Sequence, residues 1–122
     1  MPQTIGKVER KSLNAPEEVR TFEKGRIELV TVDGVTIGRA TFEPGWKWSL
    51  NVAPIAGTKS CQMAHFGYQL SGVLVTMMDD GVVTKTKPGD VVMIPPGHDA
   101  WVEGSEPVVV IDWQGMANYA RR

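Results

Sequence analysis

The chain has 122 residues, a formal net charge of −1 and a pI of about 6.1. This length fits one domain over residues 1–122 and is too short for two domains with separate cores. The near-neutral charge offers no attraction for nucleic acid, and no segment approaches the ~20 apolar residues of a membrane span. The single cysteine, Cys61, excludes an internal disulfide, and the polar start lacks a signal peptide, so we expect a cytoplasmic protein.

We expect residues 1–25 to form an N-terminal arm and a short helix. Residues 1–13 are mixed and charged, which is typical of an arm or an edge strand. Asn14 is a good N-cap residue, and Pro16 suits the first turn of a helix because its missing N–H would be unpaired there in any case. These signals predict a surface helix over 15–24.

From residue 26 onward the pattern changes to short apolar strands separated by turn residues. Asp33 and Gly34 supply the pair of positive φ angles that a type I′ turn needs, which predicts a hairpin of two strands. A second hairpin is predicted around the turn at 79–81. The expected strands are 27–32, 35–42, 73–78, 82–86, 91–94, 100–103 and 107–113.

This regular alternation of strand and turn predicts an all-β fold, either a sandwich or a closed barrel, over residues 26–113. We expect residues 114–122 to form a turn of helix or to fray. The segment Arg26–Val32 is a candidate edge strand, and an exposed edge is usefully covered by a second copy of the chain. We therefore expect a homodimer.

Residues 87–98 combine a turn, a short apolar strand, a Pro-Pro-Gly break and a histidine. Gly89 accepts a positive φ angle at the turn, and Pro95 cannot donate a hydrogen bond to a sheet, so strand pairing ends there. Gly97 then allows a bend that presents His98. The spacing of Gly89, Pro95 and Gly97 resembles the second motif of the cupin superfamily, in which a metal-binding histidine follows.

The resemblance covers residues 45–113 and is to the small, single-domain bacterial cupins of the RmlC-like type. It implies a double-stranded β-helix, or jelly-roll barrel, with a ligand pocket in its mouth and frequent dimers. In the first cupin motif two histidines precede a glutamate, and a turn glycine follows. Counting back from Gly72 places the glutamate position on His65, the second histidine on Cys61 and the first on Lys59. The chain therefore carries a Cys/His variant of this motif.

Cys61, His65 and His98 form the metal-ligand set that the resemblance implies, and they leave an open position for water or substrate. The family's second-motif histidine falls on Ala100, but His98 lies two residues earlier, so a strand would face it the same way. If residues 61–65 were extended, their Cα atoms would lie ~13 Å apart, so the chain must bend at 62–64. A sulfur and nitrogen set suits zinc, iron or copper. The alternative is a buried structural cysteine and a hydrogen-bonded core histidine.

Aromatic and flexible side chains near these ligands predict the lining of a small-molecule pocket. The candidates are Trp46, Trp48, Met63, Tyr68 and Trp101. Trp46 and Trp48 alternate across one residue, so both indoles are expected on one side of a strand. Only one of Tyr68 and the residue after it faces the interior. The alternative is that the aromatic residues fill the core or a dimer interface and that the methionines fill gaps.

Two further assignments concern groups around the histidines. Asp99 is a carboxylate beside His98 and is a candidate to orient it, although neighbours on a strand point apart. Cys61 is also a candidate nucleophile with His65 or His98 as its base. The sequence shows no third group to orient that base.

The function favoured by these observations is metal-dependent catalysis on a small organic substrate held in the barrel, of dioxygenase, isomerase or lyase type. The alternative is a non-catalytic module that senses or binds a small ligand, with or without metal. Loss of the usual histidine pair favours the binding module, and retention of three soft ligands favours the enzyme. No catalytic residue is assigned, and whether the protein is an enzyme is left open.

Overall fold

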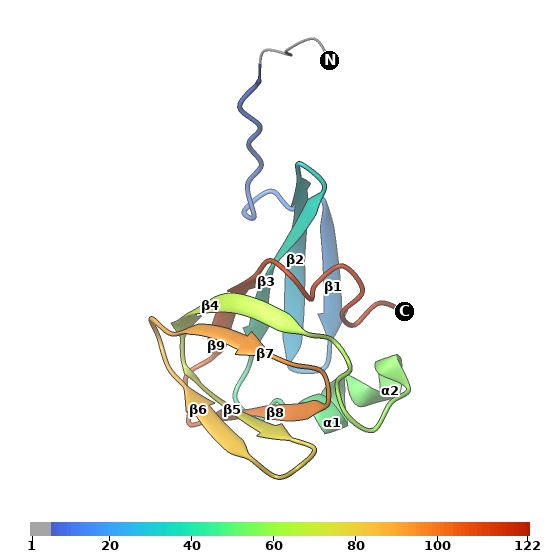
Figure 1. Ribbon diagram of the computed structural model, residues 1–122, viewed down its shortest axis with the longest axis vertical. Helices are drawn as coiled ribbons and strands as arrows, with labels where there is room; N and C mark the ends of the chain where they lie inside the picture. The colour runs from blue at the N-terminus through green and yellow to red at the C-terminus, as the bar shows by residue number, and fades with distance from the viewer. Residues whose placement is uncertain (1–5) are drawn as a thin grey trace.

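The computed structural model describes residues 6–122, so the first five residues of the expected N-terminal arm lie outside the described part. Two sheets face each other, as Figure 1 shows. The larger sheet has six strands in the order β1-β2-β3-β9-β4-β7: β1 (Glu18–Phe22), β2 (Gly25–Val32), β3 (Val35–Phe42), β9 (Val108–Asp112), β4 (His65–Ser71) and β7 (Val91–Ile94). The smaller sheet has the order β6-β5-β8: β6 (Val83–Thr86), β5 (Val73–Met78) and β8 (His98–Glu103).

The expected all-β jelly-roll fold is confirmed, although no strand pair joins the two sheets into a closed ring within residues 6–122. The core lies between the sheets, because buried residues of both belong to one cluster. It includes these side chains: Ile27, Ala40, Phe42, Trp46, Leu74, Ala100, Val102, Val108, Met116 and Tyr119. Alternation along each strand places one face of every sheet in this core.

The predicted turns are confirmed where local chemistry decides them. Asp33 and Gly34 have φ angles of 49° and 75°, and they join β2 to β3 as expected of a type I′ turn. Gly72 joins β4 to β5 and so connects the two sheets. Its φ angle is 74°, and a Cβ there would lie 2.6 Å from the carbonyl oxygen of Pro107, so only glycine fits.

The helix predicted over 15–24 is wrong, because β1 occupies Glu18–Phe22. β1 pairs antiparallel with β2, with Glu18 opposite Leu29 and Phe22 opposite Gly25. A ten-residue helix is marginal in isolation, so the hydrogen bonds of sheet pairing and the burial of Phe22 outweigh the local helix signals.

The expectation that Arg26–Val32 forms an edge is also wrong. β2 is paired on both sides, with β1 and with β3. The larger sheet ends instead at β1 and β7, and the smaller one at β6 and β8. An interface between copies of the chain therefore has to use another surface.

Two segments that the strand pattern did not predict cover one end of the molecule. α1 (Trp48–Asn51) and α2 (Ala53–Ala56) are short helices between β3 and β4. The tail after β9 does not fray: it forms turns, with N–H groups of Tyr119 and Arg121 donating to carbonyl oxygens three residues earlier, and it borders a pocket together with the two helices. The Arg20 guanidinium donates hydrogen bonds to the carbonyl oxygens of Met116, Ala117 and Tyr119 and so fixes the tail.

No helix within residues 6–122 has the length and apolarity needed to cross a membrane. Cytoplasmic residence stays a prediction.

Candidate metal site and its cavity

The backbone holds Cys61 directly beside His98. Cys61 forms an isolated antiparallel bridge with His98, and its N–H donates to the His98 carbonyl oxygen at 2.7 Å. The N–H of Gly97 donates in return to the Cys61 carbonyl oxygen, also at 2.7 Å. A segment outside the named strands is therefore fixed to the start of β8, and this pairing brings the thiol beside the imidazole.

The expected bend at 62–64 is confirmed, since Cys61 and His65 are separated by a segment without strand structure. His65 begins β4, and its Nε2 atom lies 3.7 Å from the Cys61 Sγ atom. For a tetrahedral zinc ion with bonds of about 2.3 Å to sulfur and about 2.0 Å to nitrogen, these two ligand atoms would lie about 3.5 Å apart. The observed separation fits that value.

His98 also turns Nε2 toward the cluster. Gly97 has a φ angle of 90°, which allows the bend after the prolines, and the His98 Nδ1–H donates to the carbonyl oxygen of Pro95 at 2.7 Å. That bond fixes the tautomer and leaves the Nε2 lone pair available. Ligand atoms of Cys61, His65 and His98 all lie within 4.8 Å of one another.

Asp112 anchors the second imidazole, and the sequence interpretation missed it. The Nδ1–H of His65 donates to Asp112 Oδ2 at 2.6 Å, and the other carboxylate oxygen accepts the backbone N–H groups of Gln114 and Gly115. The pair is buried and links the start of β4 to the end of β9. Gly115 is required here, because a Cβ would lie 2.6 Å from His65 Nδ1.

Charge within the cluster shifts three pKa values. Burial opposes the Cys61 thiolate, but hydrogen bonds with His65 and His98 outweigh it and lower the thiol pKa from 9.0 to about 6. Burial also opposes a charged His65, but hydrogen bonds with Asp112 and Cys61 raise its pKa from 6.5 to about 9. The Asp112 pKa is lowered despite burial, because His65 donates to the carboxylate. At neutral pH the metal-free cluster therefore holds a thiolate, an imidazolium and a carboxylate in a row.

Tyr119, from the tail, is the second residue that sequence reasoning missed. Its ring centroid lies 5.4 Å from that of His65 at a steep angle, and the residue is buried. Burial raises the pKa of Tyr119 well above 10.0, and the negative charges of Cys61 and Asp112 raise it further. The phenol therefore stays protonated and is a hydrogen-bond donor at the centre of the molecule.

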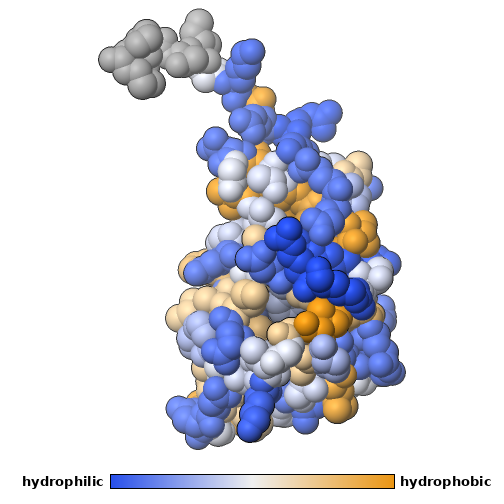
Figure 2. Space-filling model, turned by 90° about the vertical axis from the view of Figure 1, so that its right-hand side faces the viewer, coloured by the Kyte–Doolittle hydropathy of each residue, from blue (hydrophilic) through white to orange (hydrophobic). Residues whose placement is uncertain are grey.

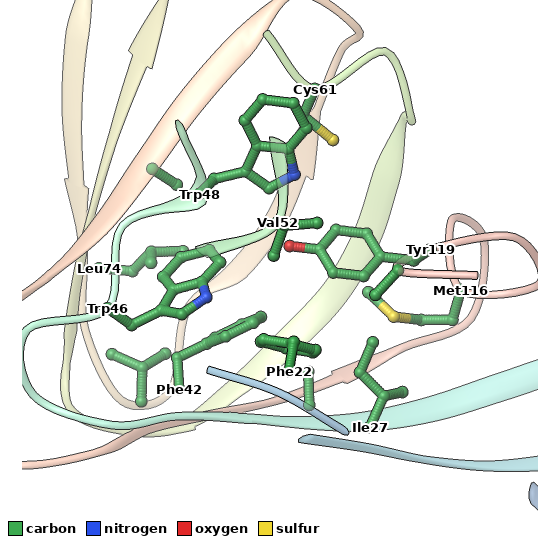
Figure 3. Packing of buried hydrophobic residues seen from close by; sticks show 14 of the residues in the cluster. Phe22, Ile27, Phe42, Trp46, Trp48, Val52, Cys61, Leu74, Met116 and Tyr119 are labelled. Atoms are coloured by element: carbon green, nitrogen blue, oxygen red, sulfur yellow. The ribbon is translucent and has the colours of Figure 1, made fainter. Parts of the chain in front are cut away.

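A cavity of about 60 Å³ lies next to the two histidines, between the sheets. Its lining is mostly apolar and includes Trp46, Trp48, His65, His98, Val110 and Tyr119. In Figure 3 the phenol oxygen of Tyr119 points into the space between the indoles of Trp46 and Trp48. The cavity therefore places an apolar space with a few polar groups beside the candidate metal ligands, as in small-molecule sites generally.

A second, larger pocket of about 380 Å³ reaches the cluster from the other side. α1, α2 and the tail bound it, and Cys61 lies in its lining together with Trp48 and Tyr119. Arg121 and Arg122 also line it. Figure 2 shows this face, where strongly hydrophilic surface adjoins hydrophobic surface around a hollow. Cys61 thus borders the outer pocket, and the two histidines border the inner cavity.

The same architecture occurs in known structures. A cupin-like protein from Thermotoga maritima matches with a TM-score of 0.53 and 19% identity, over 77% of this chain and 70% of its own. The chain has the cupin fold. An uncharacterized conserved protein from Klebsiella pneumoniae with a double-stranded β-helix domain matches with a TM-score of 0.57 and 18% identity, over 90% of this chain and 86% of its own.

A larger enzyme also shares the cupin fold. The oxalate decarboxylase of Lactobacillus farciminis, in complex with formate, matches with a TM-score of 0.60 and 16% identity. The match covers 92% of this chain and 35% of the decarboxylase. No protein-family model and no curated protein sequence matches the chain.

Within the cupin fold, the structure brings together the three ligand candidates that the motifs indicated. Lys59, at the first histidine position, is exposed, so the family's first ligand has no counterpart there. Ala100 lies in the cavity lining beside His98, as expected for residues two apart on β8. The cluster is therefore built from Cys61, His65 and His98.

The five predicted pocket residues lie in three places. Trp46 and Trp48 line the inner cavity, although Trp48 begins α1 instead of continuing a strand. Tyr68 borders the cavity with its side chain 39% exposed, because the next residue on β4 is the one that faces inward. Met63 lines the outer pocket. Trp101 lies on the opposite face of β8 from the cavity, where Lys47 Nζ is 5.2 Å from its ring centroid.

Two assignments around the histidines change. Asp99 does not orient His98, because its carboxylate accepts the backbone N–H of Ser49 and faces away from the cavity. The view that the base lacks a third group was wrong, since Asp112 orients His65. One sequence signal pointed to it: Asp112 is a lone carboxylate at the end of the apolar run 108–111. No feature of the tail sequence indicated that Tyr119 is buried.

Proposed function

We propose that the protein binds one metal ion through Cys61, His65 and His98 and acts on a small organic molecule held in the inner cavity. The observation that carries this proposal is the tautomer pattern of the two histidines. Each donates its Nδ1–H to a protein oxygen and so leaves Nε2 as the ring nitrogen that can bind an ion, and a ligand atom of each histidine lies within 4.8 Å of the cysteine sulfur. Metal-binding histidines commonly have such an acceptor on the ring nitrogen that does not bind the metal. The sulfur and nitrogen set suits zinc, iron or copper.

The chain's own residues then have distinct tasks. Asp112 holds the His65 ring and its tautomer, and the Pro95 carbonyl does the same for His98. Tyr119 keeps its proton and can donate a hydrogen bond to substrate, while the apolar lining excludes bulk water. A bound metal would supply Lewis-acid polarisation of a substrate oxygen, which suits a dioxygenase, an isomerase or a lyase.

Metal content gives the first test. Protein purified without a histidine tag and loaded with zinc, iron or copper in turn should hold about one ion per chain for at least one of them. Elemental analysis after gel filtration measures this ratio. A content below about 0.2 ion per chain for every metal would remove the metal-dependent proposal, because a three-ligand site should retain its ion.

Substrate trials should begin with small carboxylic acids. An oxalate decarboxylase in complex with formate shares the fold, and the cavity beside the histidines is small. Binding of such an acid without turnover, in protein that holds its metal, would favour the non-catalytic binding module over the enzyme. Turnover that disappears on chelation and returns with metal would favour the enzyme.

A metal-free thiol site is the second candidate, and one specific observation favours it. Cys61, His65 and Asp112 follow one another at 3.7 and 2.6 Å, the order of nucleophile, base and orienting group. Cys61 lines the outer pocket but is only 1% exposed, so the test should not depend on a reagent reaching the sulfur. After chelation, the ultraviolet absorbance of the thiolate should rise with a pH midpoint near 6, matching the lowered pKa of Cys61, and Cys61→Ser is the blank. No thiolate absorbance below pH 8 would exclude a thiolate at neutral pH.

We further propose that the chain forms a homodimer through the outer face of β4 and β7. Phe66 and Tyr68 on β4 are exposed and stand opposite Met93 and Val91 on β7, at the end of the larger sheet. Adjacent exposed apolar side chains at a sheet edge are typical of an interface. Met93→Asp should lower the sedimenting mass to that of a monomer, and Val83→Asp on the smaller sheet should not. A wild-type monomer at micromolar concentration would contradict the proposal.

A further inference from the structure

The indole N–H of Trp46 is a buried hydrogen-bond donor without an acceptor. Trp46 is 2% exposed, and its Nε1 atom has no hydrogen-bond partner among residues 6–122. Its ring stacks on Phe42 with centroids 4.0 Å apart, which fixes its orientation. Buried polar groups are paired in nearly all proteins, because desolvation without a partner costs free energy. A donor held in place without an acceptor therefore requires an explanation.

Another polar side chain in the same cavity shows the usual situation. Gln69 is 1% exposed, and its amide nitrogen donates to the carbonyl oxygens of Gly72 and Thr86. Its amide oxygen accepts the Thr86 hydroxyl at 2.7 Å. Gln69 is thus satisfied by the fold and links two strands, whereas Trp46 in the same lining is not. The difference indicates that the fold leaves the Trp46 donor for a partner that is not part of the chain.

The cavity restricts what that partner can be. A volume of about 60 Å³ corresponds to roughly two waters at about 30 Å³ for each, so only a compact molecule fits. The lining is mostly apolar, which suits a ligand with a hydrocarbon part better than a chain of waters. Figure 3 shows the Tyr119 phenol oxygen directed into the same space, so the inward polar groups include two donors. The chemistry that fits is a compact molecule carrying an oxygen acceptor.

We propose that Trp46 is a specificity-determining residue whose N–H binds the carboxylate or carbonyl oxygen of a compact small-molecule ligand. The proposal rests on the proposed function, because it names the ligand class of the cavity beside Cys61, His65 and His98. Trp46 comes from the segment between β3 and α1, whereas His65 begins β4, so different parts of the chain supply the two lining residues. An alkane or a noble gas of equal size satisfies the cavity's shape and leaves the donor unpaired.

The test follows the indole signals by NMR in protein labelled with ¹⁵N-tryptophan. The four tryptophans are assigned from single Trp→Phe variants. Acetate and acetone are titrated separately, and xenon is the probe that fills an apolar cavity without accepting a hydrogen bond. Both oxygen probes should move the Trp46 N–H proton downfield. Xenon should shift the methyl signals of Leu74 and Val110, which line the cavity, without that downfield movement.

Affinity gives an independent measurement. Trp46→Phe should weaken acetate or acetone binding by about tenfold, as expected for loss of one hydrogen bond in a dry site. Trp113→Phe, at a tryptophan that packs on Phe66 outside the cavity, should leave binding unchanged. If Trp46→Phe does not fold, the wild-type titration still decides.

The titrations are run in chelated and in zinc-loaded protein, which separates the two proposals. If zinc does not bind, the Trp46 signal is still read in the chelated form, and the proposed function is refuted when iron and copper fail to bind as well. Movement of the Trp46 signal in either form supports the inference, and movement by acetate alone restricts the ligand to carboxylates. An unmoved Trp46 signal with both oxygen probes in both forms overturns it. Equal affinity of the wild type and Trp46→Phe for acetate and acetone overturns the inference as well. The Trp46 N–H then has only water as a partner.

Discussion

The two histidines of the site are held by different kinds of anchor. His65 donates to the buried carboxylate of Asp112, which lies 47 residues away on another strand. His98 donates to the backbone carbonyl of Pro95, three residues before it. The first anchor is charged and depends on the tertiary fold, whereas the second is neutral and is built into a local bend. The two sides of the site should therefore respond differently to substitution and to pH.

The largest effect on metal binding is expected when either imidazole is removed, because the metal then loses a ligand outright. His65→Ala and His98→Ala should each abolish metal loading while leaving the circular dichroism spectrum unchanged. A site with two remaining ligands does not hold its ion against dilution. Elemental analysis after gel filtration measures the loss. Full loading in either variant would show that its histidine is not a ligand.

Removing the charged anchor should give the next largest effect. Asp112→Asn should weaken metal binding by about 10–100-fold, the usual range for a partner of a ligand histidine. The asparagine amide can donate to His65 Nδ1 and so favours the tautomer that carries its proton on Nε2. In that tautomer Nε2 has no lone pair for the metal. Competition with a chelator measures the affinity. Asp99→Asn is the control, because Asp99 faces away from the cavity, and an equal effect of both variants would contradict this role.

The charge on the His65 side predicts a pH dependence of zinc affinity. With pKa values of about 9 for His65 and about 6 for Cys61, the metal-free site at pH 7–8.5 holds a protonated imidazole and a thiolate. Binding then displaces the proton of His65, so affinity should rise about tenfold for each pH unit. Calorimetry in buffers of different protonation enthalpy counts the released proton. An affinity that stays flat across this range would show that His65 is neutral before the metal binds.

The smallest effect is expected from crowding the His65 anchor. Gly115→Ala places a Cβ against the carbonyl oxygen of Ala64 and 2.6 Å from His65 Nδ1, so the backbone before His65 and its ring, or the turn, must shift. We expect a loss of about 1–3 kcal/mol in the free energy of unfolding, together with weaker zinc binding. Gly6→Ala is the control, because no atom lies within 4 Å of its Cβ position. Denaturant unfolding of the two variants measures the difference, and equal stability would show that the anchor tolerates movement.

The same contrast between local and distant contacts explains which features of the structure could be predicted from the sequence. The turn at Asp33 and Gly34 and the bend at Gly97 follow from backbone preferences of a few adjacent residues, and both are confirmed. The bend between Cys61 and His65 followed from the distance that their shared site requires. These features need no knowledge of the rest of the chain.

Other parts depend on contacts that the sequence does not display. β1 has helix signals at its start and becomes a strand because β2 is there to pair with it. Asp112 reaches His65 only when β9 lies beside β4, and Tyr119 becomes buried only when Arg20 binds the tail. The fold was therefore predictable from local patterns and the motif spacing, whereas the anchor of His65 and the covering of the site were not.

X-ray absorption spectroscopy of zinc-loaded protein tests the central claim most directly, because it counts the atoms bound to the ion. The account predicts one sulfur at about 2.3 Å and two imidazole nitrogens at about 2.0 Å, with the sulfur lost in Cys61→Ser. A first shell of oxygen and nitrogen alone in the wild-type protein would contradict it.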